Sequence, residues 1–183
     1  MSDPVWLSDD EQRTWRRTAA VMTLLPAALD AQLQRDAGLT QFSYLVLAML
    51  SEEPGHTLPM SELASTVSSS LSRLSHVVSR LEQQGWVVRE PCPGNGRVTM
   101  ARLTDSGLEK VRATAPGHAA EVRRLVFDAI GCDRVGDLGE VTAAILARLD
   151  PAGKMRANPL ACEEHREQVR RSEQVTEPDP TGS

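Results

Sequence analysis

The sequence predicts a mainly α-helical protein that carries one small β-hairpin. Only 3% of its 183 residues are aromatic while 40% are hydrophobic, so aliphatic side chains must build the core, as they do in helical proteins with Leu, Val and Ala stripes. Most apolar residues recur at helical spacing between start and stop signals. One segment, residues 86–103, instead shows two short extended runs around a turn rich in Pro, Gly and Asn.

Two helices are predicted in the first part of the chain. The first covers residues 9–35, where Trp15 and Met22 recur at helical spacing with Ala and Leu side chains. The second opens at Thr40 and runs through the apolar sequence FSYLVLAML before a Pro-Gly pair stops it. This composition predicts a buried helix.

A short helix and a longer one are predicted to follow. An extended pair at residues 57–58 leads into a helix that begins near Pro59, where proline suits a helix start. The longer helix lies within residues 68–85, SSSLSRLSHVVSRLEQQG, and has two unlike faces. The apolar side holds Leu71, Leu74, Val78 and Leu81, and the polar side holds Ser69, Ser72, His76, Ser79, Arg80 and Gln83, with Arg73 at its flank. No acidic residue joins the polar side, since Glu82 lies near the apolar one.

The polar side of this helix has the chemistry that DNA reading requires. A helix in the major groove needs small hydrogen-bonding residues near its N-terminus and guanidinium groups that reach guanine or phosphate. Residues 68–102 carry five arginines against two glutamates, a net charge of +3, inside a chain whose net charge is −5. Taken alone, the serines fit equally well an ordinary amphipathic helix that they cap and solvate.

The hairpin completes an order of helix, turn, helix and wing. Its turn, PGNG, is followed by Arg97, and a wing arginine can enter the minor groove, where the negative potential is deep. The alternative is a solvated loop arginine. Arg89 and Arg102 flank the hairpin, and we expect them to neutralise phosphates or to pair with Glu90.

Further helices are predicted after the hairpin. A long one starts at Thr104 and is expected to be interrupted at Pro116 and Gly117, and another runs over residues 133–149. The remaining sequence, 150–183, is polar and rich in charge and proline, which predicts a weakly ordered tail.

Composition and spacing argue against several function classes. The three cysteines, Cys92, Cys132 and Cys162, fit no metal-ligand spacing and leave an odd thiol, so we expect reduced thiols in the cytoplasm and neither a metal nor a cofactor. The four histidines are scattered, without the convergent acid, base and nucleophile of an enzyme. No apolar run approaches the ~18 residues of a membrane span, and the N-terminus lacks a signal-peptide core.

The pattern resembles the MarR family of bacterial transcriptional regulators. The resemblance rests on the run RLEQQGWVVRE, then GR, then LTDSG, and extends more loosely over residues 9–149. An actinobacterial-type subgroup is similar in the wing sequence REPCP and in the later APGH. The implied fold is a winged helix-turn-helix with a β-hairpin wing, plus long N- and C-terminal helices that form a dimerisation domain.

The resemblance implies a homodimer that binds double-stranded operator DNA, and we expect a repressor. It divides the chain into a dimerisation helix (1–35), a winged helix-turn-helix lobe (36–103), further dimerisation helices (104–149) and the tail (150–183). One departure is Asn95, which stands where the family usually has the Asp of an Asp-x-Arg wing motif. By position, the DNA-binding residues are Ser69, Ser70, Ser72, Arg73, His76, Arg80 and Arg97.

Many members of the family respond to a small phenolic or other aromatic ligand, bound between the dimer helices and the DNA-binding lobe. Candidates for lining such a cleft here are Trp15, Met22, Phe42 and Tyr44, which fit core or dimer contacts as the alternative. Cys92 in the hairpin has no cysteine near it in sequence to serve as a resolving partner for oxidation.

A winged-helix module that binds another protein and no DNA is the rival hypothesis, because the acidic balance of the chain would suit it. The basic polar side of the helix within residues 68–85 argues against this alternative.

Overall fold

The structure is a computed structural model that describes residues 6–93 and 95–155. Its elements confirm the predicted fold class, mainly helical with a small sheet and with helices at both ends. In chain order they are α1 (Asp9–Ala37), α2 (Gln41–Glu52), η1 (Pro54–His56), β1 (Thr57–Pro59), α3 (Met60–Thr66), α4 (Leu71–Gln83), β2 (Val87–Cys92), β3 (Asn95–Leu103), α5 (Asp105–Val122), η2 (Arg123–Phe127), α6 (Asp128–Ile130), η3 (Cys132–Arg134) and α7 (Val135–Leu149). The predicted tail beyond residue 155 lies outside the described residues.

Four helices begin at a Ser or Thr whose hydroxyl accepts a backbone N–H of the first turn. Ser8 caps α1 in a capping box with Glu11, and Thr40, Ser70 and Thr104 cap α2, α4 and α5. Each such cap is worth about 1 kcal/mol. The starts of these four helices are therefore set by local sequence.

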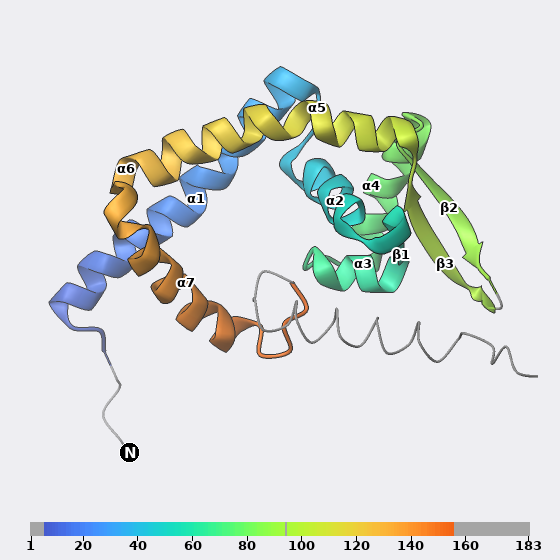
Figure 1. Ribbon diagram of the computed structural model, residues 1–183. Helices are drawn as coiled ribbons and strands as arrows, with labels where there is room; N and C mark the ends of the chain where they lie inside the picture. The colour runs from blue at the N-terminus through green and yellow to red at the C-terminus, as the bar shows by residue number, and fades with distance from the viewer. Residues whose placement is uncertain (1–5, 94, 156–183) are drawn as a thin grey trace, which may run out of the picture.

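The core lies in a compact lobe formed by α2, α3, α4 and a three-stranded antiparallel sheet of order β1-β3-β2 (Figure 1). The strand register places Leu58 opposite Ala101 and Val87 opposite Leu103, so all four side chains face the same buried layer. Fully buried residues from the helices complete it, namely Val46, Leu47, Leu50, Leu63, Leu74 and Val78.

The predicted interruption of the long C-terminal helix at Pro116 and Gly117 is wrong. Helix α5 continues through both residues and passes by a π-helical turn, η2, into α6. A proline inside a helix costs roughly 3 kcal/mol because it removes one backbone hydrogen bond. Helix α5 packs along α1 and α2, and this packing outweighs the local cost.

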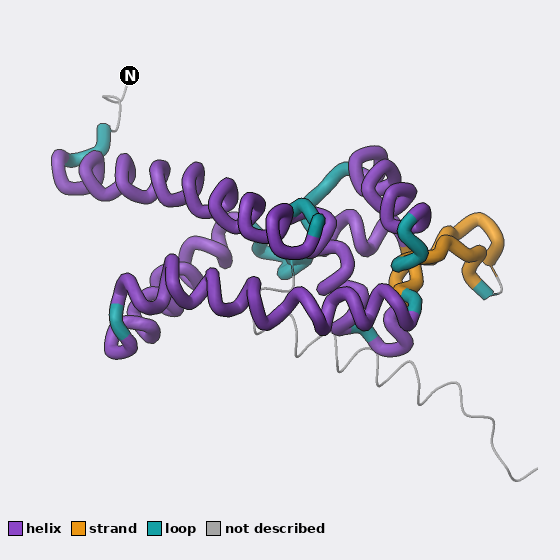
Figure 2. Tube along the Cα trace, turned by 90° about the horizontal axis from the view of Figure 1, so that it is seen from above, coloured by secondary structure: helices purple, strands orange, loops and turns teal. Residues whose placement is uncertain are grey.

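Long helices extend away from the lobe as separate arms, which Figure 2 shows from above. In α1 the buried residues are Leu29, Gln32 and Leu33, all in its C-terminal part, and α7 has none. The outer parts expose large apolar side chains, namely Trp15, Val21, Met22 and Leu24 on α1, Phe127 in η2, and Val141, Ile145 and Leu149 on α7. A single chain therefore leaves large apolar side chains uncovered along both arms.

Candidate nucleic-acid interface

Helix α4 is held on the lobe by one face only. Leu74, Val78 and Leu81 are buried there, as predicted. Leu71 is instead 53% exposed, so its predicted place in the core is wrong. It is the first residue of the helix, so no preceding helical turn covers it, and among the described residues no other element does.

The predicted polar side of α4 faces solvent. Ser72, Arg73, His76 and Arg80 are exposed, and Ser70 caps the helix from an exposed position with its Oγ 3.2 Å from the Arg73 amide nitrogen. The remaining candidate, Ser69, is half-buried in the turn between α3 and α4, and its N–H donates to the Ala64 carbonyl.

Arg89 joins the wing to α4, a role that the sequence did not reveal. Its Nε donates to Glu82 Oε2 at 2.7 Å, and its backbone N–H donates to Glu82 Oε1 at 2.9 Å. The guanidinium also donates to the hydroxyls of Ser75 and Ser79, at 3.3 and 2.8 Å. Arg89 therefore pairs with Glu82 and not with Glu90. The position of Glu82, just before the turn at Gly85 that leads into β2, was the feature of the sequence that could have indicated this pairing.

The wing carries Arg97 near its tip. Its side chain is exposed, and its backbone N–H donates to Asn95 Oδ1 at 3.3 Å. The side-chain oxygen of Asn95 thus accepts a hydrogen bond within the turn. It stands in place of the aspartate carboxylate that the wing motif named above usually has at this position. Arg102 pairs with Glu90 at 3.1 Å, one of the two roles predicted for it.

Three candidate arginines carry positive charge that the protein does not neutralise. Within residues 6–93 and 95–155, Arg73, Arg80 and Arg97 form no ion pair. Glu82 lies on the same helix but is occupied by Arg89. The exposed side of α4 and the wing tip therefore present free guanidinium groups to an approaching anion.

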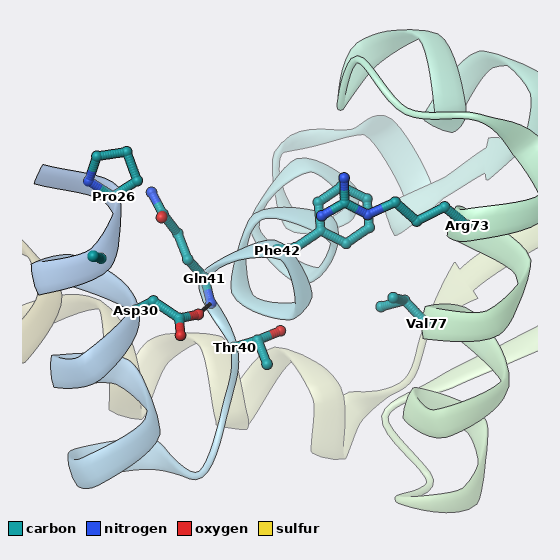
Figure 3. Close-up of a pocket in the computed structure, with 8 residues that line it drawn as sticks. Pro26, Asp30, Thr40, Gln41, Phe42, Arg73 and Val77 are labelled. Carbon is teal, nitrogen blue, oxygen red and sulfur yellow. Dashed lines mark hydrogen bonds between the residues drawn. The ribbon is translucent and has the colours of Figure 1, made fainter. Parts of the chain in front are cut away.

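An open pocket of about 490 Å³ lies beside α4, between α1 and α2 (Figure 3). Of the four candidate cleft residues, Phe42 lines it. Tyr44 packs against His118 of α5, with ring centroids 4.8 Å apart, while Trp15 and Met22 are exposed on α1. The sequence did not single out the other lining residues, Pro26, Ala27, Asp30, Thr40, Gln41, Arg73 and Val77, as a group.

No helix in the described part of the chain is long and apolar enough to cross a bilayer. The same residues contain no group of three or more His, Cys, Asp or Glu side chains placed to hold a metal ion.

Comparison with known proteins identifies similar chains. The MarR family model matches residues 39–99. Sco3205, a MarR family transcriptional regulator from Streptomyces coelicolor solved in complex with DNA, is 45% identical over 82% of this chain and 94% of that one, with a TM-score of 0.77. AbsC, a MarR family transcriptional regulator from the same organism, is 38% identical over 81% of this chain and 99% of that one, with a TM-score of 0.75.

A curated relative matches a shorter part. The HTH-type transcriptional regulator MhqR of Bacillus subtilis (strain 168) is 27% identical over 89 residues, which is 49% of this chain. The match spans 60% of the length of that relative.

The lobe, with α3, α4 and the β2–β3 hairpin in succession, defines a winged helix-turn-helix protein. A DNA-complexed relative with 45% identity is matched over almost its whole length. The chain belongs to the MarR family, whose similar members named above are transcriptional regulators.

Proposed function

We propose that the protein is a dimeric, sequence-specific regulator of transcription that binds double-stranded operator DNA and acts as a repressor. The observation that carries the proposal is the exposed side of α4, which offers Ser72, His76 and Arg80, while the glutamate of this helix, Glu82, is paired with Arg89. Such a side suits base edges and phosphates in the major groove.

The wing is proposed to contact the adjacent minor groove through Arg97. This side chain is exposed and forms no ion pair within the described ranges, and a guanidinium is favoured where the groove narrows and its potential deepens. Ser69 and Ser70, at the start of α4, are proposed to contact a phosphate of the DNA backbone near the helix N-terminus.

Dimerisation is proposed to involve the helical arms, residues 1–35 and 104–149, while residues 36–103 form the DNA-binding lobe. A second copy of the chain would cover the apolar side chains that α1 and α7 expose, such as Met22 and Ile145. Two α4 helices would then reach half-sites about one helical turn, ~34 Å, apart. A bound dimer would occlude promoter DNA.

Release by a small aromatic ligand is also proposed. The pocket beside Phe42 lies between α1, which would belong to the dimer arms, and α4, which would read DNA. A ligand that favoured another spacing of the two lobes would weaken operator binding. The proposed function requires neither a cofactor nor a catalytic step. We infer a cytoplasmic location for it, where the operator DNA lies.

The test is selection of duplex DNA from a random pool by the purified protein at near-physiological salt. Wild type is expected to enrich an inverted repeat, and the folded Arg73→Ala, Arg80→Ala double variant to lose this enrichment. The Lys154→Ala, Arg156→Ala variant, with the same change in net charge outside the lobe and the helical arms, controls for charge alone and is expected to enrich the same sequence. No enrichment by a folded wild-type dimer would favour a protein-interaction module.

A further inference from the structure

We propose that Phe42 is a positioning residue for DNA binding, and that its ring holds the Arg73 guanidinium at the edge of α4 that faces DNA. The inference rests on the proposed function. It assigns to Phe42 a role in binding DNA that is separate from lining a ligand cleft.

The two side chains come from different helices and meet face to face. The Cζ atom of Arg73 lies 4.5 Å from the centroid of the Phe42 ring, and Figure 3 shows the guanidinium lying across the ring. Phe42 is half-buried and packs against the hydrophobic core, whereas Arg73 is exposed. The ring is therefore the fixed partner, and the arginine is the partner that gains order.

Stacking leaves the hydrogen-bonding groups of Arg73 free. The ring attracts the flat face of the guanidinium, while the N–H donors lie in its plane and point away from the contact. Within the described ranges Arg73 has no ion pair. A stacked Arg73 thus keeps its donors for phosphate or base and loses less side-chain freedom on binding.

Phe42 owes its position to contacts at the start of α2. Thr40 caps the helix, and the Asp30 carboxylate of α1 accepts the Gln41 backbone N–H at 2.7 Å. Phe42 is the next residue, so the bond to Asp30 fixes the backbone beside it while its ring packs against the core. Asp30, Gln41, Phe42 and Arg73 all line the same pocket.

A double-mutant cycle separates positioning from simple packing. The affinity for the selected operator duplex is measured for wild type, Phe42→Leu, Arg73→Ala and the combined variant, with thermal melting of each as a check on folding. Phe42→Leu is expected to weaken binding about fivefold, which corresponds to about 1 kcal/mol. In the Arg73→Ala background the same change is expected to cost less than about twofold.

Two further readouts keep the inference testable. Phe42→Tyr retains an aromatic face and is expected to bind within about twofold of wild type. In the DNA-free protein, the NMR signal of the Arg73 Nε–H is expected upfield because of the ring current, and to lose this shift in Phe42→Leu or, should that variant fail to fold, in Phe42→Met.

Equal weakening by Phe42→Leu in both backgrounds, or no weakening in either, would overturn the positioning role while leaving the proposed function intact. A wild-type dimer that selects no DNA would instead overturn the proposed function and this inference with it.

Discussion

The contact between Arg89 and Glu82 predicts a measurable coupling between the wing and α4. Arg89 lies in β2 and Glu82 in the last turn of α4, and two N–H groups of Arg89 donate to the two carboxylate oxygens at 2.7 and 2.9 Å. Replacing Arg89 with Ala removes the side-chain part of this contact and the bonds to Ser75 and Ser79. We expect a less stable lobe and a helix that is held less firmly against the wing.

The magnitude follows from the geometry and the exposure of the pair. A hydrogen bond to a charged group contributes up to about 3 kcal/mol when buried, but the Arg89 and Glu82 side chains are 31% and 28% exposed. Screening by solvent lowers the expected coupling between Arg89→Ala and Glu82→Ala to about 1 kcal/mol. The exposed Arg13–Asp10 pair within α1 is the control, with an expected coupling of about 0.5 kcal/mol or less.

The assay is denaturant unfolding of the four proteins of each cycle, at equal protein concentration. A coupling below about 0.3 kcal/mol between Arg89 and Glu82 would refute the idea that this contact holds α4 against the wing. Operator binding across a salt series adds a second test. Arg80→Ala is expected to make the negative slope of log K against log salt shallower by about 1, and Arg89→Ala to leave this slope unchanged. A fall of about 1 for Arg89→Ala would mean that Arg89 contacts phosphate.

Three further predictions concern stability and assembly. A Cβ at Gly107 would lie 2.1 Å from the Trp86 carbonyl oxygen, so Gly107→Ala should lower the free energy of unfolding by about 2–3 kcal/mol. A Cβ at Gly117 in the same helix would lie 3.6 Å from Gln32 Nε2, an ordinary contact. Gly117→Ala should therefore change the free energy of unfolding by less than about 1 kcal/mol. Burial lowers the pKa of His118 in the folded protein, so as the pH falls the imidazole is protonated in the unfolded chain before it is protonated in the folded one. The free energy of unfolding should therefore fall as the pH drops below about 6.5. Thermal melts of His118→Gln should show a shallower dependence on pH. Ile145→Asp should shift the protein from dimer to monomer in light scattering, and an unchanged dimer would contradict the proposed role of α7.

Local signals in the sequence were enough to predict most of the elements. Thr40, Ser70 and Thr104 cap helices where the sequence places starts, and Gly85 follows α4 with a positive φ of 74°, as a helix stop requires. The exposed polar side of α4 follows from the spacing of its apolar residues. These features depend on residues within a turn or two of each other, which a single sequence displays directly.

Tertiary structure decided the features that depend on distant contacts. Packing against α1 and α2 carries α5 through Pro116, and the absence of a covering element leaves Leu71 exposed. The partner of Arg89 is settled by where β2 returns along α4, and that of Arg73 by where α2 meets α4. Periodicity indicates which side of a helix is polar, but only the packed arrangement of the helices determines which side chain lies opposite it.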